Sequence, residues 1–290
     1  MRLAYVVLAH VVPEQLDRLI TRLDDADDTF FVHIDRKVDT RWFISGLGDA
    51  ARKPNVHLVD RVSISWSDFG MLEATLNGMK AAATSGVPFD YLVLLTGRDY
   101  PLKPPSEIRS RLAAADGRFF MEVHELPRAD WDQEGGLERL RHPHVRLVGP
   151  RRRPPYVGWR HTRLPLKRRL PERLAPYQGS AFWWLPRDCV DYVLRTIDEQ
   201  PEVLKFFRRA FAPEESFFHT TLMNSPHAER LVNDYLRHTE WRPEYWPHGT
   251  ILEAADFSKL QASPQLFASK FDIRRDAEIL DLVDRELLDR

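Results

Sequence analysis

Continuous apolar runs and helix-periodic segments alternate along the first hundred residues. The runs at 3–9, 29–34, 56–59 and 91–95 are typical of strands buried in a parallel sheet. Between them, the segments 13–23 and 69–83 repeat apolar residues at helical spacing and predict helices with one buried face. This β-α-β-α-β order predicts an α/β fold with a mostly parallel central sheet flanked by helices.

The second half of the chain is patterned differently. Residues 179–185 predict an aromatic strand, residues 187–198 a helix, and residues 276–288 an amphipathic helix near the end. From Arg139 to Arg173, twelve Lys or Arg residues stand against one acid, and five prolines fall across 150–171. This basic segment is expected to be an excursion over the surface rather than regular structure.

Composition narrows the classes of protein. The chain has 290 residues, a formal net charge of −1 and 43% hydrophobic residues, so wholesale disorder is excluded. Its single cysteine, Cys189, excludes an intrachain disulfide. We interpret the apolar N-terminus as a buried strand rather than a signal peptide, and no segment approaches the roughly 20 apolar residues of a membrane span. The expected location is a reducing cytoplasm.

Polar residues follow the predicted strands closely. His10, Asp35 and Asp99 each come just past a strand end, which is where open α/β sheets bind ligands. Asp35 can accept a hydrogen bond from a ribose or uracil group, although a solvated turn would also explain it. Neither a dinucleotide-binding glycine motif nor a P-loop is present, and no compact Asp-x-Asp follows a strand. The histidines do not show zinc spacing.

A pair of carboxylates, Glu214 and Glu215, follows Pro213. Proline and acids are favoured in the first turn of a helix, so a helix N-terminus is predicted here, anchored in the core by Phe217 and Phe218. A carboxylate fixed in this way could act as a general base. The alternative is that the acids only complement the helix dipole.

Two further side chains have both a functional and an ordinary interpretation. Trp66, in a predicted strand-to-helix loop, can stack on a sugar or fill the core. Lys270, set between apolar residues, can neutralise a diphosphate in a cleft or extend from the surface into water.

These motifs occur in the order found in a known family. The chain resembles the core-2/I-branching β-1,6-N-acetylglucosaminyltransferases and peptide O-xylosyltransferases, nearly from end to end and closest to the xylosyltransferase branch. The matching segments are His33-Ile34-Asp35, Ser65-Trp66, Gly97-Arg98-Asp99-Tyr100-Pro101, Gly179-Ser180-Ala181-Phe182-Trp183, Pro213-Glu214-Glu215-Ser216-Phe217-Phe218-His219-Thr220, Asn224-Ser225-Pro226-His227 and Leu266-Phe267-Ala268-Ser269-Lys270-Phe271.

The resemblance implies a GT-A-type fold and an inverting transfer of xylose or N-acetylglucosamine from a UDP-sugar, without a metal or other cofactor. It implies that Glu215 is the catalytic base. On the donor side it implies nucleotide binding by Asp35 and diphosphate binding by Lys270, with Trp66 and Asp99 as further donor-site residues. His10, just past a strand end, is expected to join the donor site. Glu214 and Trp183 are the expected acceptor-binding residues.

One departure from the family concerns the diphosphate. The branching enzymes have an arginine some twenty residues before the lysine, and the segment 246–250 offers none. His248 or a residue of the basic segment is expected to replace it.

The resemblance also shapes the expected organisation and partners. We expect one domain over 1–290, with a nucleotide-binding half at 1–105 and an acceptor-side and catalytic half at 106–290. A bacterial protein acting on a glycan-type acceptor is expected, with a peripheral membrane contact through the basic segment 139–173. No nucleic acid is expected as a partner, since the stacking aromatics and known motifs are missing. The alternative is a non-catalytic protein that binds a nucleotide-sugar or carbohydrate.

Overall fold

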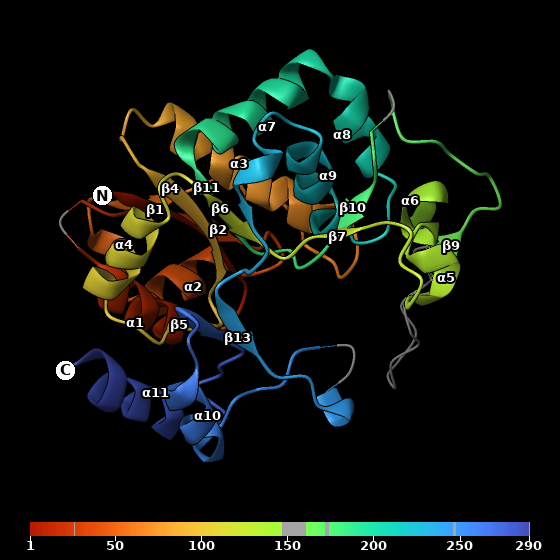
Figure 1. Cartoon of the computed structure of the whole chain (residues 1–290). Helices are drawn as coiled ribbons and strands as arrows, with labels where there is room; N and C mark the ends of the chain where they lie inside the picture. The colour runs from red at the N-terminus through yellow and green to blue at the C-terminus, as the bar shows by residue number, and fades with distance from the viewer. Residues whose placement is uncertain (26, 147–160, 172–173, 246–247, 290) are drawn as a thin grey trace.

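The computed structural model describes residues 1–25, 27–146, 161–171, 174–245 and 248–289. In this part of the chain a seven-stranded sheet forms the centre of the molecule, in the order β12-β6-β11-β4-β1-β2-β3 (Figure 1). The strands are β1 (Leu3–Ala9), β2 (Thr29–Ile34), β3 (Val56–Leu58), β4 (Tyr91–Thr96), β6 (Phe119–Met121), β11 (Trp183–Pro186) and β12 (Leu231–Val232).

Most neighbouring strands of this sheet are parallel. β1 pairs in parallel with β2 and β4, β2 with β3, and β6 with β12, while β11 runs antiparallel to both β4 and β6. Val7 lies opposite Val32 on one side and Leu95 on the other, so β1, β2 and β4 end at the same edge. The predicted α/β fold with a mostly parallel sheet is confirmed.

Helices cover both faces of the sheet (Figure 1). One face packs against α1 (Pro13–Leu23), α2 (Thr40–Gly46), α4 (Pro105–Ala114) and α11 (Glu278–Val283), and the other against α3 (Gly70–Thr84), α7 (Arg187–Glu199), α8 (Pro201–Phe207) and α9 (Phe217–Met223). Alternate side chains of β1 divide between the two cores, with Tyr5 and Val7 in one and Val6 and Leu8 in the other. This alternation explains why β1 is apolar at every position.

A smaller sheet brings the C-terminal part of the chain to the carboxyl edge of the large one. It has the order β13 (Arg237–Thr239), β14 (Phe267–Ser269), β5 (Asp99–Pro101), with β5 following β4 directly. Helix α10 (Phe257–Ala262) precedes β14. Because β14 pairs with β5, residues near 270 are placed beside the loop that ends β4.

Several boundaries differ from the prediction. The strand expected over 179–185 begins only at Trp183, because the residues before it cross the site rather than join the sheet. The expected helix 276–288 is α11 followed by a π-helical turn over Asp284–Leu288. Helices α2, α4 and α8 were not predicted. Both expected halves contribute strands to the central sheet, and the division at 105 stays a prediction.

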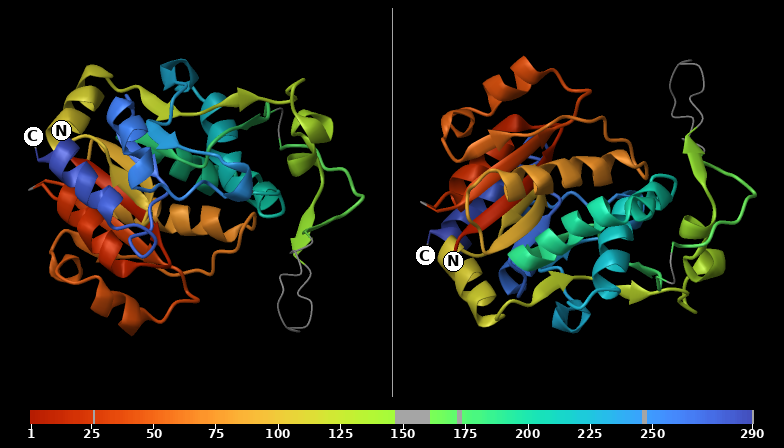
Figure 2. Two further views of the ribbon diagram at one scale, coloured as in Figure 1. Left: turned by 90° about the horizontal axis from the view of Figure 1, so that it is seen from below. Right: turned by 90° about the horizontal axis from the view of Figure 1, so that it is seen from above.

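The described parts of the basic segment 139–173 lie at the periphery (Figure 2). The strand β7 (His124–Glu125) and the helix α5 (Asp132–Gly135) precede this segment in the chain. β7 pairs with β10 (Tyr177–Gln178), which follows the segment. The described parts of the segment include α6 (Glu138–Arg141) and the pair β8 (His144–Arg146) and β9 (His161–Arg163), which stands away from the sheet in both views of Figure 2. Residues 147–160 and 172–173 lie outside the described residues, so the expected membrane contact stays a prediction.

No helix among the described residues is long and apolar enough to span a lipid bilayer.

Candidate active site

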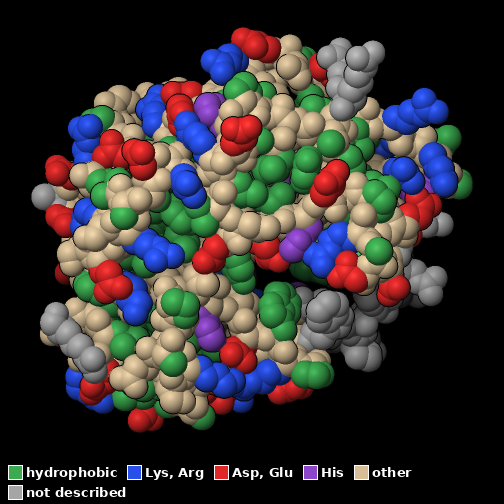
Figure 3. All heavy atoms as spheres, in the orientation of Figure 1, with side chains coloured by type: hydrophobic (Ala, Val, Ile, Leu, Met, Phe, Trp, Pro, Cys, Tyr) green, Lys and Arg blue, Asp and Glu red, His purple; other side chains and the backbone are tan. Residues whose placement is uncertain are grey.

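A cavity of about 460 Å³ opens at the carboxyl edge of the central sheet, within the range of roughly 300–1,000 Å³ typical of small-molecule sites. The face in Figure 3 is hollowed between the body of the large sheet and the C-terminal segment. Its lining comes from the ends of β1, β2 and β4, the loop 64–67, residues 180 and 182, Glu214, and the segments around 235–249 and 269–270. Of the residues expected in the site, His10, Asp35, Trp66, Glu214 and Lys270 line it together.

Asp35 is held firmly at the end of β2. It is buried, and its carboxylate accepts hydrogen bonds from the backbone nitrogens of Lys37 (2.8 Å) and Ile64 (3.2 Å). The Lys37 ammonium lies 3.5 Å from the same carboxylate. His10 lines the cavity at the end of β1, where desolvation and then the positive charge of Arg98 lower the pKa of its imidazole.

Trp66 stands in the loop between β3 and α3 and exposes 54% of its surface, so it does not fill the core. Its ring meets Phe211 edge-on at 5.6 Å and His248 at 6.5 Å. The next residue, Ser67, accepts a hydrogen bond at its carbonyl from the backbone nitrogen of Ala212 (3.0 Å). The tryptophan loop is thereby tied to the residue that precedes Pro213.

The two acids occupy different environments. They lie in a short 3₁₀ turn, Pro213–Glu215, ahead of α9, whereas the sequence predicted them in the first turn of the helix itself. Glu214 lines the cavity, is 6% exposed, and has one carboxylate oxygen, Oε2, without a hydrogen bond within the described residues. Burial, followed by the charge of Glu215, raises the pKa of Glu214 to about 8.

Glu215 faces the neighbouring segment at the rim rather than the cavity lining. Its Oε2 accepts a hydrogen bond from Arg139 Nη1 (2.7 Å) and lies 3.4 Å from Gln178 Nε2. The side chain is 37% exposed, against 32% for Arg139. Burial raises the pKa of Glu215, and Arg139 opposes that shift.

Helix α9 and residues 177–180 hold the turn Pro213–Glu215, here called the acidic turn, in place. The backbone nitrogen of Gly179 donates to the Glu215 carbonyl (2.9 Å), and a side chain at Gly179 would collide with the Glu122 carbonyl oxygen at 1.8 Å. His219 Nε2 bonds the Ser180 carbonyl (2.9 Å), and burial lowers the pKa of this histidine to about 3. The neutral imidazole therefore ties the cavity-lining Ser180 to α9, the helix that follows the two acids.

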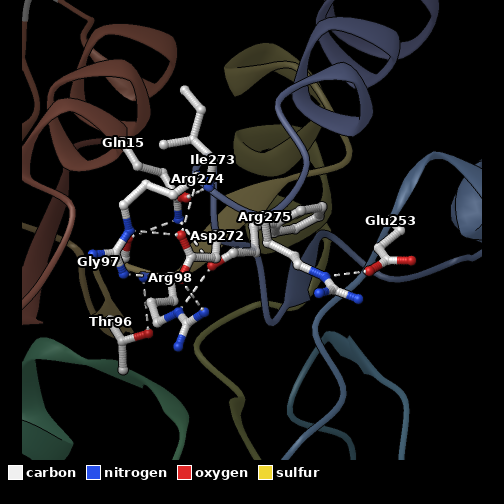
Figure 4. A network of polar contacts seen from close by, with 10 residues as sticks. Gln15, Thr96, Gly97, Arg98, Glu253, Asp272, Ile273, Arg274 and Arg275 are labelled. Carbon is white, nitrogen blue, oxygen red and sulfur yellow. Dashed lines mark hydrogen bonds and ion pairs between the residues drawn. The ribbon is translucent and has the colours of Figure 1, made fainter.

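The lining also carries two neighbouring positive charges, Lys270 and Arg98. The Lys270 ammonium forms no ion pair within the described ranges, and burial lowers its pKa, as does the neighbouring Arg98. Gln15 of α1 fixes the two loops that carry these charges. Its amide nitrogen donates to the carbonyls of Gly97 (3.0 Å) and Phe271 (3.3 Å), and its oxygen accepts from the Ile273 backbone nitrogen (2.8 Å) (Figure 4).

Asp99 does not line the cavity. It is fully buried, and its Oδ2 accepts from the Thr96 backbone nitrogen (2.5 Å) and pairs with Arg237 Nη2 (3.1 Å). The Arg237 guanidinium lies 3.5 Å from the centre of the Phe182 ring, which lines the cavity. The expected donor contact of Asp99 does not match this position, because the carboxylate supports the loop and wall from behind.

Trp183 also lies away from the cavity. It is wholly buried in β11 and packs on Phe218 at 5.2 Å, because alternate residues of this strand face opposite cores. The expected acceptor contact is therefore not available to it in this structure. Phe182, one residue earlier, lines the cavity instead.

One group of metal-ligating side chains occurs among the described residues, outside the cavity. Asp188, Cys189 and His227 lie close together, but Arg230 bonds both carboxylate oxygens of Asp188 (2.6 and 2.8 Å). Burial raises the pKa of the Cys189 thiol to about 12, so it stays protonated. The group is a structural ion pair beside a packed thiol.

Sequence reasoning missed Gln15, Arg139 and Arg98 as parts of the site. Gln15 is a polar residue on the apolar stripe of a predicted helix, and that mismatch was a detectable signal. Arg139 could not be chosen from the many arginines of the basic segment.

Comparisons with known proteins agree with the motifs. The family model of the Core-2/I-Branching enzyme matches residues 3–262. Xylosyltransferase 2 of Rattus norvegicus is 27% identical over 309 residues, covering 99% of this chain and 34% of the relative, and Xylosyltransferase 1 of Homo sapiens is 26% identical over 306 residues, covering 98% and 30%. The chain thus spans about a third of the length of these relatives.

Among solved structures, a putative glucose-1-phosphate thymidylyltransferase from Bacillus anthracis is 10% identical, with a TM-score of 0.33, over 66% of this chain and 74% of that one. The match of the family model over most of the chain confirms the resemblance seen in the sequence motifs. With the α/β sheet it also confirms the predicted GT-A-type fold. The chain belongs to the Core-2/I-Branching enzyme family.

Proposed function

We propose that this protein is an inverting glycosyltransferase that moves xylose or N-acetylglucosamine from a UDP-sugar to a hydroxyl of a glycan-type acceptor. The observation that supports this most is one cavity whose lining joins the buried Asp35, the exposed Trp66, Lys270 and Glu214, with Glu215 next in the chain. The family relationship supports the same reaction class, since the relatives are xylosyltransferases.

The donor lies along the lining from Asp35 to Lys270 in this proposal. Asp35, with a carboxylate fixed by two backbone nitrogens, receives hydrogen bonds from the uridine. Lys270 binds the diphosphate and stabilises the charge that develops on UDP as it leaves. Trp66 presents its ring to the sugar, whose apolar face packs well on an indole.

The acceptor approaches from the rim at Glu215. In an inverting transfer the acceptor oxygen attacks the anomeric carbon from the face opposite UDP, forming the new glycosidic bond as the bond to UDP breaks. The Glu215 carboxylate takes the proton of the acceptor hydroxyl, and its hydrogen bond from Arg139 favours the ionised form. Glu214, in the cavity wall, contacts the acceptor beside it.

Metal independence is part of the proposal, because the ammonium of a fixed lysine can neutralise a diphosphate in place of a metal ion. Calorimetric titration of UDP, UDP-xylose and UDP-N-acetylglucosamine, with and without EDTA, tests donor binding. We expect equal affinity in both buffers. Loss of binding in EDTA that magnesium or manganese restores would contradict the proposal.

Turnover separates an enzyme from a binding protein on the same fold. Release of UDP in the presence of candidate glycan acceptors, with the anomeric configuration of the product read by NMR, is expected to show inversion. Tight donor binding without UDP release from any acceptor would favour the non-catalytic alternative. Lys270→Gln is expected to weaken UDP binding by roughly 10- to 100-fold, whereas Lys80→Gln, on the exposed face of α3, leaves it unchanged.

A further inference from the structure

The pairing of β5 with β14 places Arg98 directly across from Lys270. The antiparallel register joins Asp99 with Ser269, so one further step brings residue 98 opposite residue 270. The Phe271 backbone nitrogen donates to the Arg98 carbonyl (2.9 Å), which continues the ladder to that step. Both Arg98 and Lys270 line the cavity.

The Arg98 guanidinium is held in one orientation. Its Nη2 donates to Asp272 Oδ2 (2.9 Å), as Figure 4 shows. Its Nε donates to the Phe271 carbonyl (2.9 Å). Asp272 is shared, because Arg274 donates to both of its oxygens (3.1 Å each). The third nitrogen of Arg98, Nη1, has no hydrogen bond in the described part of the chain. Lys270 forms no ion pair there, although the Asp99 carboxylate opposes the lowering of its pKa.

Two cations at one end of a cavity repel each other unless an anion lies between them. Asp272 is engaged by Arg98 and Arg274 together, so its single charge cannot compensate both Arg98 and Lys270. His10 and His248 also line the cavity. Desolvation and then Arg98 lower the pKa of His10, with Lys270 a smaller cause, and desolvation and then Lys270 lower the pKa of His248. What this end lacks is a group with more than one negative charge.

We propose that Arg98 and Lys270 together bind the diphosphate of the donor, and that Arg98 is the second basic residue of this site. The proposal rests on the proposed function, since it assigns a contact to the same donor. A guanidinium oriented by two hydrogen bonds offers a planar donor to phosphate oxygens, while the ammonium acts as a point charge. Arg98 thus does the work expected of the arginine that the segment 246–250 does not contain.

The test compares ligands that differ only in phosphate. Titrations of UDP and of uridine are made on the wild type, Arg98→Gln, Lys270→Gln and the control Arg274→Gln. Arg274 bonds the same Asp272 but does not line the cavity. We expect Arg98→Gln to weaken UDP binding by roughly 10- to 100-fold, with uridine affinity unchanged and Arg274→Gln like wild type. Arg98→Lys keeps the charge but not the planar donor, so it is expected to lose less UDP affinity than Arg98→Gln.

Each contrary result has a distinct meaning. Equal losses of UDP and uridine in Arg98→Gln, or the same loss in Arg274→Gln, would show that Arg98 acts through loop structure and would overturn the assignment. If Lys270→Gln alone lost UDP, Arg98 would be structural while the proposed function stood. If the wild type did not bind UDP, the proposed function would fall and the assignment with it. Should Arg98→Gln unfold, Arg98→Lys replaces it in the test. UDP binding by Arg98→Lys that is weakened and still depends on salt supports the assignment, and UDP binding equal to wild type overturns it.

Discussion

Replacing each acid of the turn by its amide separates the base from its neighbour. Glu215→Gln keeps the shape of the side chain and can still accept a hydrogen bond from Arg139, but it cannot take a proton. Glu214→Gln is expected to change the chemistry of the site much less than Glu215→Gln. With a pKa raised to about 8, Glu214 is mostly protonated near neutral pH, so the amide resembles the state it already holds.

The expected magnitudes follow from these environments. Loss of a general base lowers transfer by about 10²–10⁴-fold. The Arg139–Glu215 pair is about one-third exposed on each side, so its loss costs the fold at most about 1 kcal/mol. Glu214→Gln is expected to stay within about tenfold of wild type, a barrier change below roughly 1.4 kcal/mol.

The assay measures the transfer rate to a working acceptor at saturating donor, with UDP affinity and the melting temperature as folding controls. Both variants are expected to bind UDP like wild type, because the base acts on the acceptor. An inactive Glu214→Gln beside an active Glu215→Gln would exchange the two roles. Two active variants would refute a carboxylate base in this turn.

Three further results are expected. Arg139→Gln removes the charge that lowers the pKa of Glu215, so the acidic limb of the pH–rate profile should move to higher pH; an unmoved limb would contradict the base assignment. Burial raises the pKa of Glu214 in the folded state to about 8. The contribution of its protonated carboxyl to the free energy of unfolding is therefore complete below the unfolded pKa near 4.5 and declines as the pH rises to about 8. Urea unfolding at about pH 5 and pH 8 should show wild type losing up to about 1.4 kcal/mol per pH unit relative to Glu214→Gln; parallel stabilities would contradict this. Asp99→Asn leaves the Arg237 guanidinium buried and unpaired, so urea unfolding should show a loss of about 3–5 kcal/mol; a loss below about 1 kcal/mol would refute the pairing argument.

The parts of the fold that local pattern determines were predictable. β1, β2 and α1 have the predicted bounds, because a strand buried on both faces is apolar throughout and a helix on a sheet shows one apolar stripe. Asp35 and His10 followed from the same pattern, since residues after parallel strands gather at one edge. The missed helices α4 and α8 both begin at prolines, Pro105 and Pro201, which are favoured at a helix start but also occur in turns.

Features set by pairing between distant segments were not predictable. Trp183 and Asp99 stand in motifs that place them near the site, but strand alternation and a buried arginine turn both side chains away from the cavity. Arg98 stands next to Asp99 in the same motif and faces the cavity, because the backbone leaves β4 and enters β5 at this point.

The cationic end of the cavity depends on two such pairings at once. Arg98 and Phe271 bond each other across 173 residues of sequence, and Gln15 bonds both Gly97 and Phe271 from a third element. His248 or a residue of the basic segment 139–173 was expected to supply the second charge, because the resemblance implies an arginine some twenty residues before the lysine. The binding of a phosphate depends on the position of the positive charge and not on which segment of the chain carries it. Any basic residue that the register of β5 and β14 places opposite Lys270 can therefore serve as the second cation for the diphosphate. In this chain that residue is Arg98.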